Sequence, residues 1–92
     1  MGVRVRWSLQ SREHLVAIRT YMKEHNPDAA DRVRWRIVES VKLLRTMPRL
    51  GRTGRMRGTR EFVIPQLPYI LVYRIGGEEL VILGIFHGRR ER

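Results

Sequence analysis

The sequence predicts an α+β fold in which a two-helix antiparallel hairpin packs on one face of a twisted sheet. Apolar residues recur at helical spacing in the first half of the chain, whereas strand-like apolar runs fill the second half. A short alternating segment precedes the helices, so the expected order is an N-terminal strand, two helices and a three-stranded antiparallel meander. The length of 92 residues predicts a single domain over residues 1–92.

The first strand and the first helix meet at a serine. Residues 3–7 alternate apolar and basic side chains, which is typical of a half-buried strand. Ser8 is the expected N-cap, because its hydroxyl can accept a hydrogen bond from a free backbone N–H of the first turn. We expect a helix over residues 9–24. Its apolar stripe comprises Leu15, Ile18, Tyr21 and Met22.

A second helix begins soon after the first one ends. Asn26 is its expected N-cap and Pro27 its first residue, where a proline fits because that N–H has no partner within the helix. The Met47-Pro48 pair ends it, since the residue before a proline avoids the helical conformation. The link between the helices is short, which favours an antiparallel hairpin. We expect Trp35 to be a packing residue.

The second half of the chain contains three strand-like runs, over residues 60–64, 69–75 and 80–87. Gly76-Gly77 favours a tight hairpin turn between the last two runs. The last run is almost wholly apolar, which predicts an interior strand buried on both faces, and Gly84 within it indicates a β-bulge or a close approach by a helix. One layer of helices covers one sheet face only. The candidates to lie on or beside the opposite face are Arg60, Arg74 and His87.

Residues 49–61 form a cationic stretch with five arginines, three glycines and no acidic residue before Glu61. The chain has 19 basic residues and a formal net charge of +10, and all but two of these basic residues are arginines. Guanidinium groups bind phosphate and carboxylate in a planar, bidentate way, so the stretch indicates contact with nucleic acid or an acidic protein. A generic solubilising surface is the alternative. The candidates for binding a target or partner are Arg49, Arg52, Arg55, Arg57, Arg60 and Arg74.

Several classes of site are not expected. The absence of cysteine excludes disulfides and thiolate catalysis. No histidine–carboxylate cluster has metal-ligand spacing, and the glycines match neither a phosphate loop nor a dinucleotide fingerprint, so we expect no metal, no cofactor and no small-molecule substrate. His14 and His25 are expected to be solvated. No apolar run is long enough to cross a bilayer, which predicts a soluble, cytoplasmic protein with no membrane partner.

The end of the last strand is the strongest candidate for chemistry. His87 is followed closely by Arg89 and Arg90, and a histidine beside guanidinium groups can act as general acid or base on a phosphodiester. The alternative is a strand-end histidine that bonds to the backbone. Tyr69 and Tyr73 share one strand face, where they either stack on a nucleic-acid base or belong to the core or its rim.

Three stretches in the second half of the chain carry a family resemblance. Residues 48–61 have the pattern Pro-Arg-x-Gly-Arg-x-Gly-Arg-x-x-Gly-Thr-Arg-Glu, residues 68–74 are Pro-Tyr-Ile-Leu-Val-Tyr-Arg, and residues 82–90 are Ile-Leu-Gly-Ile-Phe-His-Gly-Arg-Arg. Together with the order of the elements, they resemble the RelE/ParE superfamily of toxins from bacterial toxin–antitoxin operons. The resemblance implies a helical hairpin on a twisted antiparallel sheet. It also implies an antitoxin, encoded alongside, that wraps the toxin with an extended or helical segment.

The resemblance implies one of two activities. RelE-like members cut messenger RNA in the ribosomal A site without metal, whereas ParE-like members poison DNA gyrase. His87 and Arg90 match positions that nuclease members use. Nuclease members often have an arginine where Ile70 stands and a tyrosine in or near the C-terminal tail, which this chain lacks.

The isoleucine at position 70 and the lack of a tyrosine in the tail favour a ParE-like gyrase inhibitor. The alternative is a RelE-like ribosome-dependent endoribonuclease, and a non-toxic nucleic-acid-binding domain is the second alternative. The positive charge predicts an antitoxin segment that is acidic and amphipathic and that pairs its carboxylates with the arginines.

Overall fold

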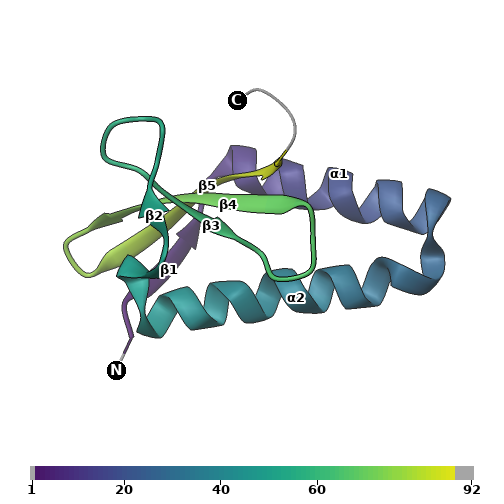
Figure 1. The fold of residues 1–92 in the computed structure, drawn as a ribbon, viewed down its shortest axis with the longest axis horizontal. Coiled ribbons are helices and arrows are strands. Elements are labelled where there is room, and N and C mark those ends of the chain that lie inside the picture. Colours follow the sequence, from purple (N-terminus) through teal and green to yellow (C-terminus); the bar gives the residue numbers. More distant parts are fainter. Residues whose placement is uncertain (1, 89–92) are drawn as a thin grey trace.

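A computed structural model describes residues 2–88, so the predictions for Arg89 and Arg90 lie outside the described residues. Figure 1 shows two long helices that run in opposite directions and meet at the end of the molecule remote from the β4–β5 turn. A twisted sheet packs against them. The elements are β1 (Arg4–Trp7), α1 (Leu9–His25), α2 (Pro27–Thr46), the 3-10 helix η1 (Pro48–Leu50), β2 (Arg52–Thr53), β3 (Arg60–Val63), β4 (Tyr69–Gly76) and β5 (Glu79–His87).

The helices begin and end where the sequence indicates. The Ser8 hydroxyl accepts a hydrogen bond of 3.1 Å from the N–H of Ser11 and thereby caps α1. Asn26 separates the two helices, with a φ of −156° and a ψ of 70° that are not helical. Pro27 is the first residue of α2, although the Asn26 side chain makes no capping hydrogen bond. The helix α2 ends before Met47, as the following proline predicts.

The sheet has five strands in the order β1-β5-β4-β3-β2. The strand β1 runs parallel to β5, and the other pairs are antiparallel, so the sheet is mixed and contains the expected three-stranded meander. The strand β5 lies between β1 and β4. Its predicted burial on both faces is confirmed, because Leu80 and Ile82 belong to the helix-side core while Val81 is buried on the opposite face. The two-residue strand β2 was not expected.

Gly84 lies beside a β-bulge and also close to a helix, which are the two alternatives that a glycine within this strand indicated. Val72 pairs with Gly84 and Tyr73 with Ile82, so Leu83 has no partner opposite it and forms a β-bulge. A Cβ added to Gly84 would lie 2.6 Å from the Phe86 ring and 3.2 Å from the His14 ring on α1. A larger residue here would therefore displace the Phe86 ring and crowd the His14 ring.

A single apolar core joins α2 to the helix-facing side of the sheet. Full burial of one such side chain contributes about 1.5–3 kcal/mol to stability. The buried members of the cluster are Val33, Ile37, Leu44, Ile64, Leu71, Tyr73, Leu80, Ile82 and Ile85. Partly buried residues of β1 and α1 pack around it, Leu15, Ile18 and Met22 among them.

Two aromatic residues expected to pack inside are exposed instead. Tyr21 is 55% exposed and stacks on His25, with ring centres 4.2 Å apart and planes 7° apart. Trp35 is 57% exposed on α2, where it falls outside the stripe formed by Val33 and Ile37. Its ring has the Arg36 guanidinium 5.9 Å from its centre.

Three residues were expected to lie on or beside the sheet face opposite the helices, and one of them does. Arg74 alternates with the core residue Tyr73 on β4 and is exposed on that face. Arg60 pairs directly with Tyr73, and His87 pairs with Tyr69, so both lie on the helix side. The prediction for Arg60 and His87 is therefore wrong.

Candidate functional site: an arginine hairpin and a groove

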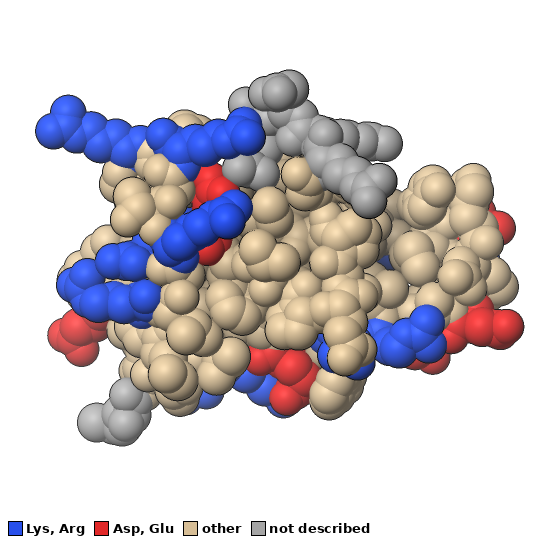
Figure 2. Space-filling view, in the orientation of Figure 1, with Lys and Arg blue, Asp and Glu red and all other residues tan. Residues whose placement is uncertain are grey.

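The cationic stretch folds into a small antiparallel hairpin, here called the arginine hairpin (residues 52–61). Arg52 pairs with Glu61 and Thr53 with Arg60 at its base. Figure 1 shows its turn projecting beyond the rest of the sheet, and Figure 2 shows Lys and Arg side chains gathered over this end of the molecule. The stretch that the sequence indicated as a loop is thus a turn over residues 54–59, closed at its base by a short strand pair.

Glu61 holds the arginine hairpin together. Its side chain is only 4% exposed. One carboxylate oxygen accepts a hydrogen bond of 3.0 Å from the backbone N–H of Arg55, and the other lies 3.4 Å from the Arg52 guanidinium. The sequence interpretation treated Glu61 as the end of the cationic run and missed this role. The available signal was its place as the only acidic residue between positions 40 and 77.

The turn of the hairpin is fixed by its own backbone. The N–H of Gly54 donates to the carbonyl of Thr59 over 2.8 Å, and the Thr59 hydroxyl donates to the carbonyl of Met56 over 2.6 Å. Gly58 has a φ of +79°, which a glycine adopts without strain. These contacts leave the side chains of Arg55, Met56 and Arg57 exposed at the tip.

Tyr73 and Arg60 attach the start of the hairpin to the core. The Tyr73 hydroxyl donates to the carbonyl of Pro48 over 2.6 Å and accepts from the N–H of Gly51 over 2.9 Å. One Arg60 Nη donates to the carbonyl of Gly51 over 2.7 Å. Burial raises the pKa of Tyr73, and the Gly51 hydrogen bond and the charge of Arg60 partly offset that rise.

These contacts divide five of the six predicted binding residues into two groups. Arg60 and Arg52 have partners within the fold, at the Gly51 carbonyl and the Glu61 carboxylate. Three other guanidinium groups are exposed and make no hydrogen bond or ion pair with residues 2–88, namely those of Arg49, Arg57 and Arg74. Tyr73 is fully buried, so its ring has no free face for a base, and the stacking prediction is wrong for this residue.

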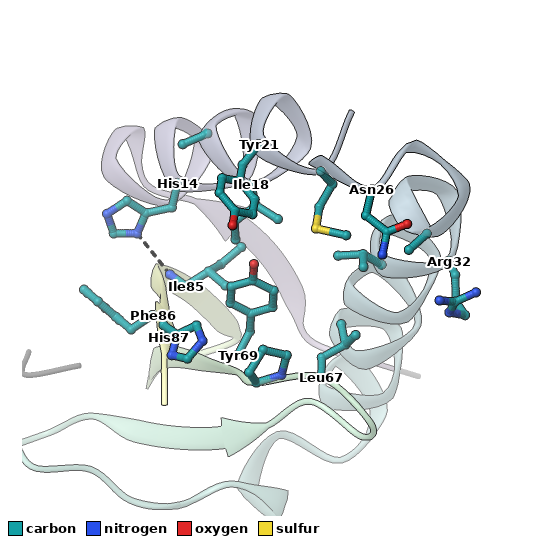
Figure 3. Close-up of a pocket in the computed structure, with 15 residues that line it drawn as sticks. His14, Ile18, Tyr21, Asn26, Arg32, Leu67, Tyr69, Ile85, Phe86 and His87 are labelled. Atoms are coloured by element: carbon teal, nitrogen blue, oxygen red, sulfur yellow. Dashed lines mark hydrogen bonds between the residues drawn. The ribbon is translucent and has the colours of Figure 1, made fainter. Parts of the chain in front are cut away.

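A groove of about 700 Å³ lies at the other end of the sheet, between the helical hairpin and the ends of β4 and β5. Figure 3 shows side chains from α1, α2 and the sheet converging on it. Tyr69 and His87 face each other at its edge, with ring centres 5.9 Å apart and planes 83° apart. The apolar lining includes Ile18, Met22, Val33, Leu67 and Ile85, and Arg32 stands at the rim.

His14 has a structural role that the sequence did not indicate. Its Nδ1 accepts a hydrogen bond of 3.1 Å from the N–H of Ile85, as Figure 3 shows, and its ring packs edge-on against Phe86 at 5.0 Å. The strand β1 pairs with β5 only as far as Ile82, so His14 satisfies a backbone donor beyond that point. The prediction that His14 is solvated is wrong.

Of the three residues predicted to be catalytic, the described part of the chain includes His87 alone. They bring His87 next to Tyr69, while Arg89 and Arg90 lie outside residues 2–88. The same part of the chain contains no group of three His, Cys, Asp or Glu side chains placed to hold a metal ion. Within residues 2–88, neither helix is long and apolar enough to cross a membrane.

A helical hairpin on a mixed sheet of this topology defines the class of RelE/ParE-like toxin folds. A chain from the chromosomal ParDE toxin–antitoxin system of P. aeruginosa superposes with a TM-score of 0.85 at 26% identity, over 94% of this chain and 96% of that one. A chain of the RelBE2 toxin–antitoxin complex of Mycobacterium tuberculosis shares the fold, with a TM-score of 0.62, at 24% identity over 95% of this chain and 99% of that one.

Sequence comparison narrows the class to one family. Residues 5–92 match the family described as the ParE toxin of the type II toxin–antitoxin system parDE. The Y4kP protein of Sinorhizobium fredii, which its name groups with toxins, is 40% identical over 88 residues, covering 96% of this chain and 91% of that protein. The chain therefore belongs to the ParE toxin family, as the resemblance in its sequence predicted.

Proposed function

We propose that this protein is a ParE-like toxin that stops bacterial growth by inhibiting DNA gyrase, and that a cognate antitoxin neutralises it. The observation that carries the proposal is the match of residues 5–92 to the ParE toxin family. Ile70 supports it, because this residue is buried where RelE-like nucleases often carry an arginine. On this proposal the exposed arginines make contacts rather than perform chemistry.

The antitoxin is proposed to be an acidic, amphipathic segment. The groove suits such a segment, because its lining is mainly apolar and Arg32 at its rim can pair with a carboxylate. The protein from P. aeruginosa with the same fold comes from a toxin–antitoxin system, which supports a partner of this kind. That the antitoxin also pairs with Arg52, Arg55 and Arg57 stays a prediction.

Inducible expression in a bacterium tests the proposal. The chain alone is expected to arrest growth and to change the supercoiling of a reporter plasmid, and co-expression of a small acidic protein from the neighbouring reading frame is expected to restore both. Growth arrest with normal plasmid topology and halted protein synthesis would contradict gyrase as the target. Normal growth would favour the non-toxic nucleic-acid-binding alternative.

A RelE-like endoribonuclease is the second candidate, and the Tyr69–His87 pair is the observation that favours it. A histidine and an aromatic ring meet at the edge of the groove, directly before the arginine-bearing tail. This candidate predicts that the chain cleaves ribosome-bound message and that His87→Ala abolishes the cleavage. His25→Ala is the matched control, since His25 lies at the exposed end of α1. Equal cleavage by both variants would exclude the candidate.

A further inference from the structure

We propose that the tip of the arginine hairpin, formed by Arg55, Met56 and Arg57, binds duplex DNA by entering its minor groove. The inference goes beyond the proposed function, because it requires only this chain and DNA. It rests on the chemistry of the tip, on how the tip is held, and on the charge that surrounds it.

The tip combines an apolar side chain with two cations. Met56 is 69% exposed, although a methionine side chain is apolar, and exposed arginines precede and follow it. Proteins that bind the minor groove use arginine to follow its negative potential and often insert an apolar side chain between base pairs, which kinks the duplex. Arg55-Met56-Arg57 supplies both groups within three residues.

The tip is also held in place before it binds. The Glu61 carboxylate fixes the N–H of Arg55, and the hydroxyl of Thr59 fixes the carbonyl of Met56. A tip ordered in this way loses less conformational entropy on binding than a disordered loop. Its projection beyond the sheet, visible in Figure 1, suits insertion into a groove.

Further exposed arginines lie near the arginine hairpin in the chain or in the sheet. Arg49 precedes the hairpin, Arg52 lies at its base, and Arg74 is exposed on β4, the next strand but one from β2. Contacts from such side chains to phosphates would position the duplex without reading its sequence. Arginine fits this role because its planar guanidinium binds phosphate in a bidentate way.

Charge alone would equally suit an acidic peptide, but the shape and the methionine favour DNA. An acidic peptide lying against a projecting turn would pair with the arginines, but it would cover Met56 only if it also placed an apolar side chain there. Insertion between base pairs would bury the Met56 side chain and keep both guanidinium groups near phosphates. The acidic peptide is therefore treated as a competing outcome in the test.

The test uses the purified full-length chain and a short duplex with a central TA step that carries a fluorophore at each end. Fluorescence anisotropy gives the affinity as a function of salt, and energy transfer between the ends reports bending. Arg57→Ala is expected to make the log–log salt slope less negative by about 0.9, the value of one phosphate contact. Met56→Ala is expected to abolish bending, and Met56→Leu to retain it.

The matched control is the pair Arg12→Ala and Val16→Ala, which removes an exposed cation and an exposed apolar side chain from α1. The control is expected to leave the slope and the bending unchanged. The inference is overturned if the duplex does not bind, if tip and control variants lose equal affinity, or if Met56→Ala still bends the duplex. It is also overturned if the tip variants keep DNA binding but lose binding to an acidic antitoxin peptide.

A gyrase supercoiling assay on the same proteins separates this inference from the proposed function. A chain that bends DNA through its tip but leaves gyrase active would contradict the proposed function alone. A chain that inhibits gyrase without tip-dependent DNA binding would contradict this inference alone.

Discussion

The carboxylate of Glu61 accepts a hydrogen bond of 3.0 Å from the backbone N–H of Arg55, across the turn of the arginine hairpin. A buried negative charge thus sets the conformation of an exposed, positively charged tip. Since the same carboxylate lies 3.4 Å from the Arg52 guanidinium, one side chain fixes both the base and the turn of the hairpin. The presentation of the arginines depends on this residue, which is not itself exposed.

Replacement of Glu61 tests that dependence. Glu61→Gln removes the charge from the buried hydrogen bonds and is expected to lower the free energy of unfolding by about 1–3 kcal/mol. The Arg55 amide is expected to exchange its hydrogen faster, which NMR can measure. Glu78→Gln in the exposed β4–β5 turn is the control and is expected to change stability by less than about 0.5 kcal/mol. Equal protection of the Arg55 amide in both variants would contradict the role of Glu61.

The buried phenol of Tyr73 is expected to make the stability of the fold depend on pH in the alkaline range. Burial raises its pKa above the ordinary value of 10.0, so the folded state holds the phenol proton more tightly than the unfolded state. This contribution is fully present below pH 10.0 and is lost as the pH rises through the pKa of the folded state.

Denaturant unfolding at about pH 8 and about pH 11 measures this effect. Tyr73→Phe is expected to be less stable at the lower pH, because Pro48 and Gly51 lose their hydroxyl partner, and to lose less stability on going to the higher pH. Tyr21→Phe, which changes an exposed ring, is expected to follow the parent protein. Parallel pH curves for all three proteins would refute the assignment.

Gly51 is expected to tolerate no side chain. A Cβ added there would lie 2.6 Å from the Tyr73 hydroxyl and 2.9 Å from the carbonyl of Glu61, both of which are held by the core. Gly51→Ala should therefore lower the free energy of unfolding by about 1–3 kcal/mol through overpacking. Gly76→Ala is the control, because an added Cβ there meets nothing within 4 Å. Thermal unfolding of the two variants compares them, and equal midpoints would argue against a close approach at Gly51.

His14 is expected to contribute to stability because its ring packs between α1 and β5. His14→Ala leaves the N–H of Ile85 without its acceptor and should lower the free energy of unfolding by about 1–3 kcal/mol. His25→Ala should cost less, because His25 is exposed at the end of α1. Chemical denaturation measures both, and a larger loss for His25→Ala would show that the His14–Ile85 bond contributes little.

Local sequence signals predicted the elements that depend on neighbouring residues. Ser8, Pro27 and Pro48 marked helix ends because caps and prolines act within one turn, and Gly84 marked a bulge for a similarly local reason. The apolar character of residues 80–87 predicted an interior strand because burial on two faces leaves no polar alternation.

The features that the sequence did not predict depend on contacts between distant residues. The strand β2 has two residues, which are too few to show any periodicity in the sequence. It is formed by pairing with β3, where Arg52 lies opposite Glu61. The partners of the Tyr73 hydroxyl, Pro48 and Gly51, are 25 and 22 residues away in the sequence. The hydrogen bond between His14 and Ile85 joins residues that are 71 positions apart. In each case a polar group is positioned by tertiary packing that no local pattern records. The arginines were visible in the sequence, but their division into structural and exposed groups was not.

The proposed function is tested most directly by a gyrase supercoiling assay with the purified chain, run in parallel with an in vitro translation reaction. The proposal predicts that a stoichiometric excess of the chain blocks supercoiling or traps cleaved DNA while translation continues. Normal supercoiling with arrested translation and cleaved message would contradict it and favour the ribosome-dependent nuclease.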